Sequence, residues 1–173
     1  MHSARSLTLL MLLLAASTSC GNGRQAITPE DLPQILLQAN EAPPGTAKAA
    51  QTGGAQDLDA FARDATERDA LIEDGFVQGY VVYFAPTEFF DPQGEVGQGS
   101  VSVQVIAGLF EEPEGAASSL ARFLDDLRGR QLSVSTDLAA PMLGDEAYGL
   151  EGAVASDGSP LILYAWRVEN PSS

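Results

Sequence analysis

Residues 101–127 constrain the fold most strongly, because they combine the two periodicities that distinguish strands from helices. Apolar side chains alternate from Val101 to Leu109, which predicts a strand with one buried face. From Ala116 to Leu127 the apolar positions instead recur every three or four residues, which predicts an amphipathic helix. A strand followed by such a helix indicates a fold in which helices cover a β-sheet.

Further signals extend this pattern in both directions. Leu58, Phe61 and Ile72 fit one apolar stripe of a single helix over residues 57–75, which Gly75 would end. The apolar, partly aromatic strand that follows would end at Pro86. Later strands are predicted over 131–138, 150–155 and 160–170, with a turn over 156–159 between the last two. The order predicts an α+β fold, a single domain with an antiparallel sheet and helices packed on it.

The segment between residues 28 and 56 gives weaker signals. Thr28 and Pro29 suit the N-cap and first position of a short helix over about 29–39. Residues 40–56 are rich in Pro, Gly and Ala and lack a periodic apolar pattern, so we expect a flexible loop there.

The first nineteen residues have the composition of a secretory signal peptide. The run from Leu7 to Ala16 carries no charge, and the small residues 17–19 follow it. The run is too short for a membrane-spanning helix, which needs roughly 20 apolar residues.

Cys20 follows this segment directly and is the only cysteine of the chain. Small residues before a cysteine resemble the lipobox of bacterial lipoproteins, although Ser17 stands where that family prefers Leu. The resemblance implies that the Cys20 thiol is acylated with diacylglycerol and that the signal peptide is removed before it. The alternative is ordinary signal cleavage near residues 16–19, which would leave a free thiol.

A second resemblance covers residues 58–169. It rests on three stretches: EDGFVQGYVVYF, EEPEGAASSLARFLDDL, and LGDEAYGLEG followed by LYAWRVEN. They resemble small bacterial lipoproteins of uncharacterised function and, more loosely, the α-β-α sandwich of PsbP-like extrinsic proteins. The resemblance implies binding or accessory roles without naming one. The expected organisation is a signal peptide over 1–19, a tether over 20–27, a short helix and flexible loop over 28–56, and an α+β domain over 57–173.

The charge balance excludes some partners. The chain has 9 basic and 24 acidic side chains, a net charge of −15. Removal of residues 1–19 takes away Arg5 and no acid, so the imbalance grows. Binding to nucleic acid depends on Lys and Arg that neutralise phosphates, so this composition argues against it.

Several catalytic chemistries are also excluded. His2 is the only histidine, and it lies in the predicted signal peptide. Without it the chain has no nucleophile–histidine site and no histidine ligand for zinc, and we expect no cofactor. Carboxylate chemistry is left, and its candidates are Glu111, Glu112, Glu114, Asp125, Asp126, Asp145 and Glu146. We interpret the glutamates as favourable charge at a helix start, Asp125 and Asp126 as solvent-facing, and Asp145 as a backbone cap.

Two features of the loop after residue 86 are candidate sites. Asp91 and Glu95 could supply oxygen ligands to calcium, although they lack the spacing of a twelve-residue calcium loop, and a turn explains them as well. The adjacent Phe89 and Phe90 either close over the core or form a contact patch for a partner or an apolar ligand. Trp166 shares a strand face with apolar neighbours, and we expect it in the core.

These observations predict a protein on the outer face of a bacterial membrane, anchored through lipid on Cys20. Its domain would bind a protein or a small ligand and would not be an enzyme. One alternative is a carboxylate-dependent hydrolase of envelope glycans, which requires two acids about 5–10 Å apart, one with a raised pKa. The other is a structural spacer without a pocket.

Overall fold

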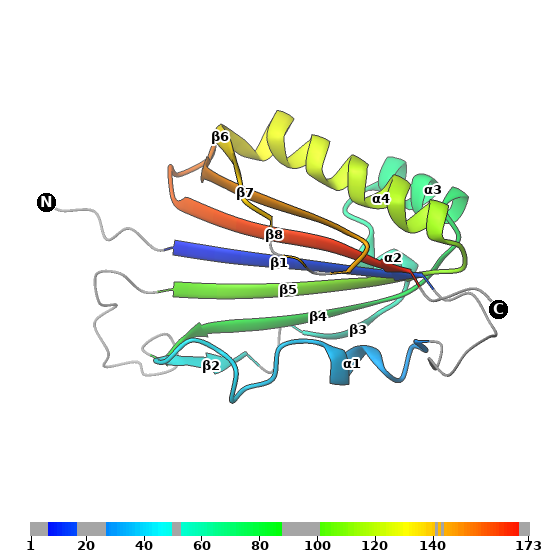
Figure 1. Ribbon diagram of the computed structural model, residues 1–173, viewed down its shortest axis with the longest axis horizontal. Helices are drawn as coiled ribbons and strands as arrows, with labels where there is room; N and C mark the ends of the chain where they lie inside the picture. Colours follow the sequence, from blue (N-terminus) through cyan, green and yellow to red (C-terminus); the bar gives the residue numbers. More distant parts are fainter. Residues whose placement is uncertain are drawn as a thin grey trace, which may run out of the picture.

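The computed structural model has an α+β fold, as predicted, and describes residues 7–16, 27–49, 53–87, 101–140, 142 and 144–169. In this part of the chain eight strands form one sheet in the order β2-β4-β5-β1-β8-β7-β6, and β3 pairs with β4 (Figure 1). The elements are β1 (Leu7–Ala16), α1 (Leu32–Ile35), β2 (Thr46–Lys48), β3 (Gly54–Gln56), α2 (Leu58–Phe61), α3 (Ala65–Glu73), β4 (Phe76–Pro86), β5 (Val101–Phe110), α4 (Pro113–Asp126), a π-helical turn (Leu127–Gln131), β6 (Leu132–Leu138), β7 (Glu146–Val154) and β8 (Pro160–Glu169).

The sheet is antiparallel on each side of a central parallel strand. Strands β2, β3, β4 and β5 pair antiparallel, and so do β6, β7 and β8. Between these halves lies β1, which pairs parallel with both β5 and β8. The apolar run that the sequence assigns to a signal peptide therefore forms the middle strand, of which the structure describes the backbone.

Each face of the sheet carries its own apolar core, because side chains alternate along every strand. On the face covered by α1, Leu32 and Leu36 pack against Val82, Val103 and other residues of β4 and β5. On the opposite face, α4 packs through Leu120, Leu124 and neighbouring residues onto Leu163 and other residues of β7 and β8. Figure 1 shows α1 at the bottom of the view beside β4, and α3 and α4 at the top. We call the two faces the α1 face and the α4 face.

The prediction of one helix over residues 57–75 is wrong, because the helix breaks after Phe61. Asp57 caps α2, and Asp64 caps α3 by accepting a hydrogen bond from the Glu67 amide at 2.8 Å. The break changes the phase of the apolar stripe, so that Leu71 is buried and Ile72 is exposed. The predicted stop at Gly75 is confirmed, since this residue has a φ of 68°.

Residues 28–49 and 53–56 contain more regular structure than their composition predicts. Strands β2 and β3 pair with β4 within the expected flexible loop, because backbone hydrogen bonds to an existing strand need no apolar periodicity. Helix α1 is shorter than expected, and Asp31 rather than Thr28 lies at its N-cap. Thr28 instead donates from its amide and hydroxyl to the Asp31 carboxylate, at 2.9 and 2.8 Å.

Other predicted elements are confirmed. Strand β5 and helix α4 span the expected residues and bury the expected faces. The turn between β7 and β8 contains Gly158 at a φ of 72°. Trp166 packs, half-buried, against the core of the α1 face.

Candidate functional site

A cavity of about 1080 Å³ lies on the α4 face, between the α2–α3 pair and α4. It is lined by Gln56, Ala60, Phe61, Arg63, Asp64, Thr66, Glu67, Ala70, Leu71, Val81, Gln104, Ile106, Ser119, Arg122, Phe123, Asp125, Asp126, Gly129, Arg130 and Gln131. We call it the α2–α4 cavity. Its floor is the β4–β5 pair, where Val81 lies opposite Ile106 in the sheet register.

The cavity lies beside α4, which packs against β1, β5 and β8 and leaves part of β4 and β5 uncovered. Leu120 and Leu124 of α4 belong to the core formed with Leu163 and its neighbours in β7 and β8. Phe123 lies on the side of α4 that lines the cavity and is half-buried. Val81 and Ile106 are likewise half-buried, so the floor presents apolar surface to the cavity.

The opposite wall is held close to the sheet at Gly79. A Cβ atom added at this glycine would lie 2.1 Å from the ring of Phe61, so only glycine allows α2 to approach this closely. The Phe61 ring contacts the Phe76 ring at a centroid distance of 4.7 Å, and Phe76 meets Phe110 edge-on at 5.7 Å. These contacts fix the α2 wall against the first residues of β4.

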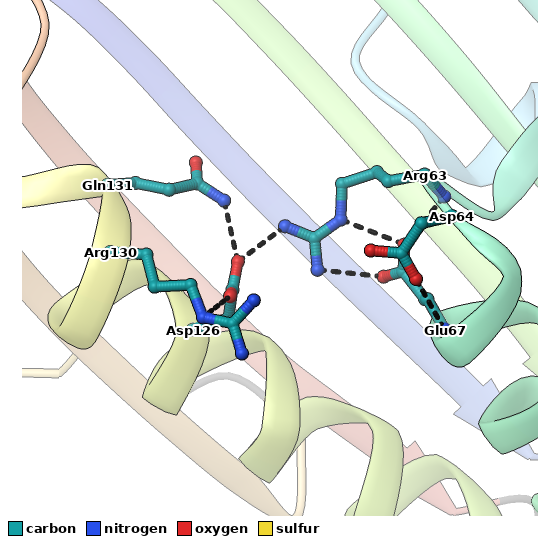
Figure 2. A network of polar contacts seen from close by, with 6 residues as sticks. All are labelled: Arg63, Asp64, Glu67, Asp126, Arg130 and Gln131. Atoms are coloured by element: carbon teal, nitrogen blue, oxygen red, sulfur yellow. Dashed lines mark hydrogen bonds and ion pairs between the residues drawn. The ribbon is translucent and has the colours of Figure 1, made fainter.

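A polar network joins the two walls, with Arg63 at its centre (Figure 2). The Arg63 guanidinium donates to Glu67 through Nε and Nη2, at 2.8 and 2.9 Å, and to Asp126 of α4 through Nη1 at 2.6 Å. The pKa of Arg63 is raised, mainly by the hydrogen bonds to Glu67, with Asp126 adding to the effect and burial opposing it. The α2–α3 linker is thereby tied to the end of α4.

The π-helical turn after α4 completes this network. Gln131 donates to Asp126 Oδ2 at 2.9 Å, and Arg130 Nε lies 3.2 Å from Asp126 Oδ1. The pKa of Asp126 is lowered by the Gln131 and Arg63 hydrogen bonds, so the carboxylate is charged at neutral pH. The Asp126 side chain is 18% exposed and that of Arg130 is 81% exposed. Arg130 is thus the cation of the cavity rim that solvent reaches most easily.

A second ion pair joins the two walls one turn closer to the N-terminus of α4. Arg122 contacts the carboxylate of Asp74, which follows α3, and also donates to Ser118 at 2.8 Å. Gly115 allows the start of α4 to approach the end of α3, because an added Cβ atom would lie 1.9 Å from the Asp74 carbonyl oxygen. The cavity is therefore bounded by walls that contact each other on both sides of it.

Four carboxylates line the cavity, Asp64, Glu67, Asp125 and Asp126, and the pKa of Asp126 is lowered. Among the described carboxyl groups whose pKa departs clearly from its ordinary value, all are lowered: Asp31, Asp126, Glu146 and Asp157. Only Asp126 of these lines the cavity, and it accepts hydrogen bonds from Arg63 and Gln131. A carboxylate held in this way is a poor proton donor at neutral pH.

A separate polar cluster joins the ends of β7 and β8. Glu146 accepts from the Tyr148 hydroxyl and lies 3.2 Å from Arg167 Nε. The Tyr148 hydrogen bond lowers the pKa of Glu146 and raises that of Tyr148. The Asp145 carboxylate accepts from the Glu169 amide at 2.7 Å, which confirms its predicted role as a backbone cap. This cluster fastens two strands and lies outside the cavity lining.

The site residues predicted from sequence fall in parts of the chain that the structure does not describe. Cys20, Phe89, Phe90, Asp91 and Glu95 all lie outside the described residues. The lipid site, the contact patch and the calcium candidate therefore stay predictions.

The predicted carboxylates are described, and one prediction about them is wrong. Glu112 is the N-cap residue of α4 and Glu114 lies in its first turn, as interpreted. Asp125 is exposed, but Asp126 faces the cavity network instead of solvent. Sequence reasoning also missed Arg63, whose partner Asp126 is 63 positions away. The only local signal was Asp64 followed by Glu67, a spacing that marks a helix start.

Comparison of the chain with protein-family models, curated proteins and solved structures finds no match. Within the described ranges, no cluster of three or more His, Cys, Asp or Glu side chains is arranged to hold a metal ion. In the same part of the chain, no helix is long and apolar enough to cross a bilayer. The fold thus defines an α+β domain with a cavity between α2–α3 and α4.

Proposed function

We propose that this chain is a lipid-anchored cell-envelope protein whose α+β domain binds a small amphipathic ligand in the α2–α4 cavity without catalysis. The observation that carries the proposal is the cavity itself. Its volume of about 1080 Å³ slightly exceeds the range of roughly 300–1,000 Å³ typical of small-molecule sites. Such sites combine mostly apolar walls with a few polar groups that orient the ligand.

The lining suggests which end of a ligand lies where. Val81, Ile106 and Phe123 offer apolar surface on the floor and on one wall. At the α4 end, Arg130 contacts Asp126 through Nε, and the described chain places no acceptor on its two terminal nitrogens. An acyl chain over the floor with a carboxylate at Arg130 fits this arrangement, so a fatty acid such as laurate is a suitable probe.

Titration calorimetry of the folded protein with laurate tests the binding site. Arg130→Gln should weaken binding about fivefold, which corresponds to the roughly 1 kcal/mol of a solvent-exposed ion pair. Arg128→Gln is the matched control, because this neighbouring arginine pairs with Asp137 and does not line the cavity. Equal affinities for the two variants would contradict the assignment of the polar end.

A second pair of variants tests the apolar floor. Ile106→Trp places a larger side chain in the cavity and should abolish laurate binding. Val134→Trp adds the same indole ring at an exposed position of β6 and should bind like the unmodified protein. Binding that survives Ile106→Trp would exclude the cavity as the ligand site.

The anchor is proposed from the sequence and the charge. A domain with 24 acidic and few basic side chains would be repelled by anionic headgroups, and one acyl chain alone anchors a protein only marginally. A diacylglycerol on Cys20 supplies two chains and needs no basic patch. Cys20→Ser should release the protein from membranes and abolish labelling by a fatty-acid analogue, whereas Ser19→Ala keeps the thiol and should keep both. Unchanged membrane association of Cys20→Ser would contradict the anchor.

Two observations weigh against the alternative functions. A hydrolase would need a protonated acid in the cavity, and Asp126 has a lowered pKa. A spacer would need no cavity, and the one between α2–α3 and α4 is large enough for a small molecule.

A further inference from the structure

Strand β1 lies in the middle of the sheet and also within residues 1–19, which we propose are removed. What happens to the sheet after this removal rests on that proposal. Strand β1 pairs along its length with β5 on one side and with β8 on the other. Its removal would leave two facing strands with unpaired amides and carbonyls in the middle of the sheet. A buried amide or carbonyl without a partner destabilises the fold, and an exposed strand edge can pair with another chain.

The register of β1 allows these two strands to meet. Leu9 pairs with Val103 of β5 and with Ile162 of β8, so Val103 and Ile162 lie at the same level. Met11 likewise pairs with Val105 of β5 and with Tyr164 of β8, so Val105 and Tyr164 also lie at the same level. Residues at the same level of neighbouring parallel strands project to the same face. Direct pairing of β5 and β8 would therefore keep every side chain on its present face, whereas a slip of one residue would reverse them.

The membership of the two cores is consistent with this assignment of side chains to faces. Val103 and Val105 of β5 lie in the core of the α1 face, and Trp166 and Val168 of β8 pack against the same core. The parallel direction also needs no new connection, because α4 and strands β6 and β7 already form the crossover from β5 to β8. Closing the sheet requires a shift of one strand spacing, about 4.8 Å.

We propose that β5 and β8 pair directly once residues 1–19 are removed, and that β1 separates these two strands only in the unprocessed chain. Helix α4 already contacts both strands, because the core that buries its Leu120 and Leu124 includes Phe110 at the end of β5 and Leu163 of β8.

Disulfide trapping in the full chain tests this closure. A Cys20→Ser background carries Val103→Cys and Ile162→Cys, and a protease recognition sequence replaces residues 21–26. With β1 in place the two Cα atoms are about 10 Å apart, which is beyond disulfide reach. After the cut, direct pairing brings them to about 5 Å. We expect free thiols before cleavage and one intramolecular disulfide after it, together with release of the leader peptide in gel filtration.

Two matched pairs control the experiment. Val82→Cys with Val105→Cys joins neighbours of β4 and β5 and should be oxidised before and after the cut. Val103→Cys with Leu163→Cys places the thiols on opposite faces and should stay reduced in both forms.

The closure is overturned by any of four results: the Val103–Ile162 pair stays reduced after the cut, it is oxidised before it, it links two chains instead of one, or the cut chain loses its far-UV circular dichroism. The cut is made by added protease, so none of these results depends on whether Cys20 is acylated. A failed anchor would appear only in the fatty-acid labelling experiment.

Discussion

The two faces of the sheet are built from the same strands, but their helices cover them differently. On the α1 face, Leu32 and Leu36 are buried against β4 and β5, although α1 is a helix of only four residues. On the α4 face, a helix of fourteen residues packs against β1, β5 and β8, and a cavity lies beside it above β4 and β5. The area of a sheet face that a helix covers therefore depends on where the helix lies across the sheet rather than on the length of the helix.

The two faces also differ in the kind of contact that holds their helices in place. The α1 face is closed by apolar side chains, whose burial contributes most of the stability of a core. Across the cavity of the α4 face, α2–α3 and α4 are joined by Arg63–Asp126 and Arg122–Asp74, which are ion pairs near the surface. Substitutions on the two faces should therefore have unequal effects.

The largest difference is expected between Leu32→Ala and Val81→Ala. Leu32 is completely buried on the α1 face, so its truncation should lower the free energy of unfolding by about 2–5 kcal/mol. Val81 is half-buried beside the cavity, and its truncation should cost about 1 kcal/mol or less. Urea unfolding followed by circular dichroism measures both. Equal losses would mean that the cavity is closed in solution.

The contact between α3 and α4 gives the next effect. Gly115→Ala should lower the free energy of unfolding by about 1–3 kcal/mol, because the new methyl group would overlap the Asp74 carbonyl. Gly129→Ala is the control, since no heavy atom lies within 4 Å of its added Cβ. If both variants unfold at the same urea concentration, α4 does not approach α3 as described.

Removal of Arg63 should have a smaller effect. Arg63→Gln leaves the largely buried Asp126 without its main cation and should cost about 1 kcal/mol. Arg68→Gln breaks an exposed pair with Asp59 and should leave the unfolding midpoint unchanged. A larger loss for Arg68→Gln than for Arg63→Gln would contradict the role of Arg63 as the link between the walls.

The smallest effect concerns pH. The pKa of Asp126 is lowered in the folded chain, so its contribution to stability is present above its unfolded value of about 3.9. The contribution is lost as the pH falls through the lower folded value. Asp126→Asn should therefore lose less stability than the unmodified protein between pH 5 and pH 2. Asp125→Asn, at the exposed neighbour, should follow the unmodified protein, and identical profiles for all three would contradict the network.

Local patterns predicted much of the fold. The alternation of β5 and the period of α4 give the element type and the buried face directly, because both are properties of consecutive residues. The break between α2 and α3 was missed, since the apolar stripe continues through it in the sequence, whereas α2 ends at its C-cap residue Ala62 and the Asp64 side chain caps the start of α3. Strands β2 and β3 were missed because they depend on pairing with β4.

The cavity could not be predicted from such patterns. It depends on the lateral position of α4 and on the Arg63–Asp126 pair, whose members are far apart in the sequence. The central position of residues 7–16 was likewise missed, because their composition matches a leader segment and gives no information about a partner strand.

The most direct test of the cavity is methyl NMR of the folded protein during titration with laurate. We expect shifts for the methyl groups of Val81, Ile106 and Leu71, which line the cavity, and none for Leu32 and Val82 on the α1 face. Shifts confined to Leu32 and Val82, or no shifts at saturating laurate, would contradict it.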